Sequence, residues 1–127
     1  MQNKVTNVSI LGSTGSIGES TLDVISRHLD RFSVFALSAN VSVDILESQC
    51  LRFSPRYAVM GNEMAANSLR EKLSGRCATE VMHGDDGLVA IVSSSQVDSV
   101  MAAIVGAAGL SSALAAASAG KRVLLAN

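Results

Sequence analysis

The segment that most constrains this chain is a glycine-rich turn between a strand pattern and a helix pattern. The run G-S-T-G-S-I-G at 12–18 directly follows the strand-like run V-S-I-L at 8–11. It precedes a helical pattern that places Leu22, Ile25 and Leu29 on one face. A strand, a glycine turn and a helix in this order are typical of the first unit of a doubly wound α/β domain.

Such a turn is suited to holding phosphate. Glycines let the backbone approach a bound phosphate closely, and the next helix offers free N–H groups and the positive end of its dipole. We therefore predict a pyrophosphate cradle for a dinucleotide, beginning at Gly12. Two alternatives need no ligand: a tight turn that binds nothing, and a capping box in which Ser16 and Glu19 close the helix start. The backbone donors stay available in either case.

Strand and helix patterns alternate along the rest of the chain. We expect strands at about 5–11, 33–39, 57–60, 78–82, 97–105 and 123–126, and helices at about 16–29, 42–53, 62–73, 86–93 and 110–119. Repeated βαβ units predict a mainly parallel sheet with helices on both faces, a Rossmann-like α/β fold. The 127 residues are enough for one domain with its own core.

Composition excludes several classes of function. A hydrophobic content of 48% with a net charge of −1 indicates a soluble globular protein, without the basic excess that nucleic acids or anionic membranes attract. Cys50 and Cys77 are interpreted as small core residues in a reducing compartment, and we expect a cytoplasmic location. The stretch 99–120 is uncharged and long enough to cross a bilayer. Its weakly apolar composition and two glycines favour a buried strand followed by a buried helix instead.

The end of the second predicted strand bears on which dinucleotide is bound. NAD-binding domains commonly place a carboxylate there for the ribose hydroxyls. Here the segment 38–42 contains no Asp or Glu, and the first acid after it is Asp44. The segment contains no Lys or Arg either. The sequence therefore leans towards NADP.

Catalytic chemistry is missing from the pattern. We find no nucleophile–base pair, metal cluster or paired carboxylates, and we interpret His28, His83 and the run 85–87 as surface helix and turn residues. Asn127 closes the chain at the end of a predicted strand, where ligands of open α/β sheets bind. We expect the chain to be the cofactor half of a longer enzyme.

Four segments resemble one known family. They are the turn with S-T-L-D-V at 20–24, F-S-P-R-Y-A-V at 53–59, V-M-A-A-I-V-G-A-A-G-L at 100–110, and A-G-K-R-V-L-L-A-N at 119–127. In this order the chain resembles the N-terminal part of 1-deoxy-D-xylulose 5-phosphate reductoisomerase. The resemblance implies an NADPH-binding domain over 1–127. It also implies a full-length enzyme, a homodimer, that rearranges and reduces its sugar phosphate to 2-C-methyl-D-erythritol 4-phosphate in the non-mevalonate isoprenoid pathway. A divalent metal, Mg or Mn, would be held by the missing catalytic domain.

The resemblance also assigns binding residues. The family's phosphate-loop contacts fall on 14–17, and its contact at the last strand falls on Asn127. Many members carry Gly-Lys-Asn where Asn40, Val41 and Ser42 stand, so the Lys is lost here and Asn40 and Ser42 are taken as substitutes. The candidate cofactor-binding residues are Gly12, Thr14, Gly15, Ser16, Ile17, Asn40, Ser42, Ala103 and Asn127. No residue is assigned to catalysis or to metal binding.

Two other functions remain open at this point. Another reductase with the same glycine spacing, such as an aspartate-semialdehyde dehydrogenase, would explain the turn but not the motifs at 101–110 and 124–127. A stand-alone nucleotide-sensing module would explain the missing catalytic groups. The gene beyond Asn127 separates these, since Lys-Glu followed by a long continuation that carries acidic residues supports the enzyme and a stop codon supports the module.

Overall fold

The computed structural model describes residues 4–103 and 115–125, and strands and helices alternate along them. The elements are β1 (Thr6–Leu11), α1 (Ser16–Ser26), β2 (Phe32–Ser38), α2 (Val43–Phe53), β3 (Tyr57–Met60), α3 (Glu63–Leu73), β4 (Glu80–His83), α4 (Gly84–Ser93), β5 (Ser99–Ala102) and β6 (Arg122–Leu125). A further helical turn covers 115–118.

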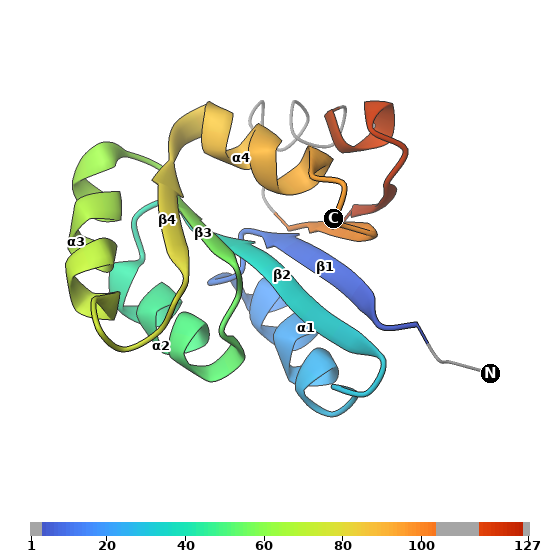
Figure 1. Ribbon diagram of the computed structural model, residues 1–127, viewed down its shortest axis with the longest axis horizontal. Coiled ribbons are helices and arrows are strands. Elements are labelled where there is room, and N and C mark those ends of the chain that lie inside the picture. Colours follow the sequence, from blue (N-terminus) through green and yellow to red (C-terminus); the bar gives the residue numbers. More distant parts are fainter. Residues whose placement is uncertain (1–3, 104–114, 126–127) are drawn as a thin grey trace.

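The strands form one parallel sheet with helices on both faces (Figure 1). On one face, α1, α2 and α3 bury Leu22, Leu46 and Leu69 in a single apolar cluster. On the other face, Ile91 of α4 and Ala116 pack into a second cluster. The predicted Rossmann-like α/β fold is confirmed.

The strand order, β4-β3-β2-β1-β5-β6, reverses direction at β1. Successive strands β2, β3 and β4 lie to one side of β1, whereas β5 and β6 lie to the other (Figure 1). Connections leave β1 and β5 towards opposite faces at such a point, which opens a crevice at their carboxyl ends. The glycine turn begins at this crevice, because it follows β1 directly.

One register shift interrupts the pairing of β1 with β2. Val8 lies opposite Val34, but the next residue, Ser9, lies opposite Ala36. Phe35 is therefore an extra residue in β2, and it packs in the cluster on the α4 face. Beyond the shift the pairing is regular, and it ends with Leu11 opposite Ser38.

The first helix is shorter than predicted. It ends at Ser26, and the chain then turns through hydrogen bonds from the N–H groups of Arg31 and Phe32 to the His28 carbonyl. Leu22 and Ile25 are buried as expected, but Leu29 is 61% exposed. The prediction that Leu29 lies on the buried face is wrong, because the helix ends before this residue.

The other predicted elements are found with shifted ends. β4 and α4 meet at His83 and Gly84, and β5 is shorter than the predicted 97–105. Most of the predicted helix 110–119, and the end of the strand 123–126, lie outside the described residues. Within the described residues, no helix has the length and apolar character needed to cross a membrane.

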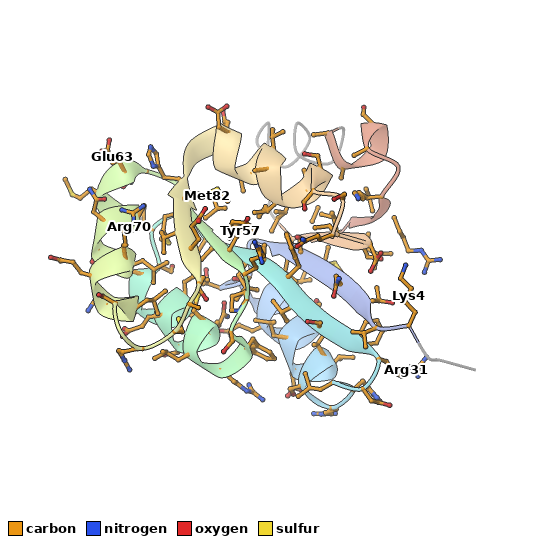
Figure 2. The ribbon with its side chains drawn as sticks, viewed as in Figure 1. Lys4, Arg31, Tyr57, Glu63, Arg70 and Met82 are labelled. Carbon is orange, nitrogen blue, oxygen red and sulfur yellow. The ribbon has the colours of Figure 1, made fainter. Side chains whose placement is uncertain are left out.

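Polar side chains connect the amino end of β1 with the segment that leads into β5. The backbone N–H of Asn7 donates to Asp98 Oδ2 at 2.8 Å, and Asn7 Nδ2 donates to the Gln96 carbonyl at 3.0 Å. Lys4 Nζ lies 3.5 Å from Asp98 Oδ1; Figure 2 shows Lys4 just before β1. The Asn7 N–H lowers the pKa of Asp98, and the charge of Lys4 adds to this against the opposing effect of burial.

The two cysteines are free thiols. Cys50 is fully buried, and this burial, with Cys77 nearby, raises its pKa to about 12. A thiol of this kind stays protonated and packs as a small apolar side chain. Cys77 is half-buried beside the same cluster, so only Cys50 is a full core residue.

Candidate functional site

A pocket of about 530 Å³ runs along the carboxyl ends of the strands. Its lining residues follow successive strands, and they include Gly12 and Gly15 after β1, Asn40 after β2, Gly61 after β3 and Ala103 after β5. The pocket therefore occupies the crevice where the strand order reverses, which is the ligand site of open α/β sheets.

The three glycines of the turn do different things. Gly12 has a φ of 76°, which L side chains rarely adopt, and it makes the sharp exit from β1. A Cβ on Gly18 would come within 2.6 Å of Ser13 Cα and closer still to the Gly12 carbonyl oxygen. Glycine is therefore needed there for α1 to pack on the turn. Gly15 has an ordinary φ of −80°, and its nearest neighbour, the Gly12 oxygen, would be 3.7 Å from a Cβ. Gly15 is free of both constraints, and it lines the pocket.

The start of α1 presents backbone donors. Gly15 is the N-cap, no side chain caps the helix, and the first helical hydrogen bond runs from Glu19 N–H to the Gly15 carbonyl at 2.9 Å. The N–H groups of Ser16, Ile17 and Gly18 have no acceptor within the described part of the chain. The capping-box alternative is wrong, since Ser16 lies inside the helix rather than at its cap. Three free donors at the positive end of a helix dipole form an anion site.

The turn is held from β2 and α2. Ser13 N–H donates to the Ser38 carbonyl at 2.8 Å, and Gly12 N–H donates to Ser38 Oγ at 3.1 Å. Ser13 also exchanges two hydrogen bonds with the side chain of Gln49 on α2. Ser13 and Ser38 are almost fully buried, so these bonds form away from water.

The segment after β2 carries no charged side chain into the pocket, as the sequence indicates, but the candidates Asn40 and Ser42 are placed differently from each other. Asn40 packs over Gly61, whose N–H donates to the Asn40 carbonyl at 2.8 Å, and a Cβ on Gly61 would meet the Asn40 side chain. Ser42 is the N-cap of α2, and its hydroxyl makes no capping bond. Val41 is 60% exposed. No Lys or Arg lines the described pocket, and its charged lining residue is Asp85.

The structure brings most of the predicted residues together. Gly12, Thr14, Gly15, Asn40 and Ala103 line the pocket. Ser16 and Ile17 follow in the first turn of α1, both exposed, whereas Ser42 is half-buried outside the lining. The candidate Asn127 lies outside the described residues.

The sequence reasoning missed the far wall of the pocket, which includes Met60, Gly61, Gly84 and Asp85. These residues lie at or directly after the ends of β3 and β4, so the rule that ligands bind at carboxyl ends could have found them. The interpretation of 85–87 as surface turn residues is wrong for Gly87, which is buried and whose Cβ would lie 2.9 Å from Val59 Cγ1.

Other parts of the described chain offer no competing site. A larger hollow of about 710 Å³ lies along α3, between Met64 and Thr79, and contains none of the predicted residues. Within 4–103 and 115–125, no three His, Cys, Asp or Glu side chains are grouped to hold a metal ion.

Known proteins are similar to this chain in sequence and in fold. A family model described as 1-deoxy-D-xylulose 5-phosphate reductoisomerase matches residues 8–127. Relatives of that name from Saccharophagus degradans and Aromatoleum aromaticum are 58% and 57% identical over 94% and 98% of this chain. The chain spans 31% of the length of each of these two relatives.

Solved structures agree. A DOX-P reductoisomerase in complex with magnesium matches 98% of this chain with a TM-score of 0.93 and 45% identity, and the chain covers 31% of that protein. The 1-deoxy-D-xylulose 5-phosphate reductoisomerase from Zymomonas mobilis in complex with NADPH matches 98% of this chain with a TM-score of 0.90 and 44% identity, over 32% of its own length.

Proposed function

The chain belongs to the 1-deoxy-D-xylulose 5-phosphate reductoisomerase family, and we propose that residues 1–127 are the NADPH-binding domain of such an enzyme. The observation that carries the proposal is the group of free N–H donors of Ser16, Ile17 and Gly18 beside the pocket. They match the chemistry of a pyrophosphate, which needs several donors and no bulky side chain close by.

The candidates that line the pocket extend in both directions from this anion site. Thr14 and Gly15 border the pyrophosphate, and Asn40 with Ser42 lies where the 2′-phosphate of the adenosine would bind. Ala103 follows β5 on the other side of the reversal point, where the nicotinamide would bind. Asn127 is a candidate through the family resemblance alone. NADPH would supply a hydride when bound, and the role of these residues would be to bind and orient the NADPH.

The activity of the whole protein is part of the same proposal. The full-length enzyme would convert 1-deoxy-D-xylulose 5-phosphate to 2-C-methyl-D-erythritol 4-phosphate, with Mg or Mn held outside this chain and with two subunits in the active form. The free cysteines support a reducing compartment, and we propose the cytoplasm.

Titration of the full-length protein with NADPH tests the binding proposal. We expect saturable binding, followed by oxidation of NADPH that depends on both the sugar phosphate and the divalent metal. A full-length protein that binds no NADPH would overturn the assignment. A gene that stops after Asn127 would instead support a stand-alone nucleotide-sensing module.

A further inference from the structure

Gln49 is a buried polar residue that directs both ends of its amide at the glycine turn. It lies on α2 and is 9% exposed. Its Oε1 accepts from Ser13 Oγ at 2.7 Å, and its Nε2 donates to the Ser13 carbonyl at 2.9 Å. One side chain therefore holds a single residue of the turn, 36 positions away, at two points.

Packing alone does not explain an amide at this place. Leu46 and Cys50, on the same helix, are fully buried in the apolar cluster between the sheet and α1–α3. A leucine or methionine side chain would itself need no hydrogen-bond partner there, whereas an amide must have its polar groups paired. Both hydrogen bonds of Gln49 go to Ser13, so its contribution depends on the shape of the turn.

The position of the turn decides where the anion site lies. Gly15 N–H donates to the Gly12 carbonyl at 3.3 Å, so the turn that begins beside Ser13 leads directly into the free donors of α1. Ser42, the proposed neighbour of the 2′-phosphate, is the N-cap of α2, two turns before Gln49. The Gln49–Ser13 pair thus joins the two places where the cofactor's phosphates would bind.

We propose that Gln49 is a positioning residue for the cofactor: through Ser13 it fixes the donors of α1 at the distance from α2 that a dinucleotide requires. This inference rests on the proposed function. It concerns a residue that touches the turn and not the cofactor.

The substitution Gln49→Met in the full-length enzyme removes both hydrogen bonds and nearly keeps the volume. We expect the KM for NADPH to rise about tenfold, the equivalent of one or two such bonds, with kcat little changed. NADH should lose affinity by the same factor, because it carries the same pyrophosphate. The inhibition constant of adenosine 2′-phosphate should stay unchanged, because that compound has no pyrophosphate.

Cys50→Ala is the matched control. It removes a fully buried group at the next position of α2, on the apolar side of the helix. We expect it to lower Tm without raising the KM for NADPH. An equal rise in KM in this control, an unchanged KM in Gln49→Met, or weaker binding of adenosine 2′-phosphate would each overturn the inference. A wild-type enzyme that does not bind NADPH would overturn the proposed function instead.

Gln49→Glu adds a pH-dependent measurement. An ionised carboxylate can accept from Ser13 Oγ but cannot donate to the Ser13 carbonyl, whereas the protonated acid can do both. Burial favours the protonated acid. We expect the KM for NADPH of this variant to fall as pH is lowered, with no such change in Gln49→Met. The same pH profile in both variants would contradict the role of the Nε2 donor.

Discussion

Gly15 and Gly18 differ in what a new side chain would meet, although the spacing of the glycine run makes them look alike. Gly15 has an ordinary φ, and a Cβ there would make only an ordinary contact with the Gly12 oxygen, at 3.7 Å. In Gly15→Val of the full-length enzyme, the added side chain should occupy the space of the pyrophosphate. We expect a large rise in the KM for NADPH and a loss of stability of no more than about 1 kcal/mol. Steady-state kinetics and thermal unfolding measure the two effects.

Gly18→Ala should give the reverse result. Its Cβ would enter the backbone of Ser13, so α1 must move away from the turn. We expect a loss of about 1–3 kcal/mol in the free energy of unfolding, measured by urea titration. Unchanged NADPH kinetics in a folded Gly15→Val, or an equally stable Gly18→Ala, would contradict this division of roles.

Val41 sets the expected preference between cofactors. By the family resemblance it takes the place of a Lys, and it is exposed just before α2. Val41→Lys in the full-length enzyme should tighten NADPH binding through a charge-assisted hydrogen bond worth about 1.5–3 kcal/mol. NADH has no 2′-phosphate and should bind as before.

Fluorescence titrations of both cofactors at low and high salt measure this difference. The gain for NADPH should shrink at high salt, because exposed charges are screened. Equal gains for both cofactors, or none for either, would mean that residue 41 does not face the 2′-phosphate.

At the scale of elements, Asp98 connects β1 to the segment that leads into β5. Its pKa is lowered in the folded protein, so the ionised form stabilises the fold. That stabilisation is present above the ordinary pKa of an aspartate and is lost as pH falls through the lowered, folded-state pKa. We expect Asp98→Asn to unfold at lower urea concentration than wild type near pH 7, with the difference vanishing as the pH approaches about 2. A difference that stays constant with pH would exclude this ionisation as its cause.

The elements that sequence could predict are those with local signals. The strand Tyr57–Met60 follows from a short apolar run and the helix end at Phe53 from the single proline, and the structure confirms both. Leu29 was misplaced because its spacing continues the helical pattern, and only the turn at His28 ends the helix.

The residues of the candidate site also divide into those with a local sequence signal and those without one. The glycine turn could be predicted because its residues are adjacent in sequence, and five of the nine candidate residues line one pocket. Gln49 could not be predicted, since its importance depends on which distant segment the fold places beside it. Gln49 meets Ser13 across 36 positions, and no local pattern encodes that contact.

At the scale of the whole molecule, the proposed cofactor pocket lies in a chain whose described residues contain no metal-binding cluster. We expect the isolated 127-residue chain to be inert when it is mixed with 1-deoxy-D-xylulose 5-phosphate, NADPH and Mg²⁺ or Mn²⁺. Absorbance of NADPH at a range of chain concentrations measures this, with circular dichroism as the control for folding. Oxidation above the rate without protein, dependent on both substrate and metal, would show that this chain carries its own catalytic residues.

Because β2 contains an extra residue, the site depends on the number of residues in this strand as well as on which residues they are. Phe35 sets the phase in which the second half of the strand meets β1, and therefore brings Ser38 to the backbone of Gly12. Deleting one residue there would reverse the alternation of every later position in the strand and shift Ser38, Ala39 and Asn40 together. Substitutions along β2 can be compensated one at a time, but a change of a single codon in its length would move an entire wall of the pocket.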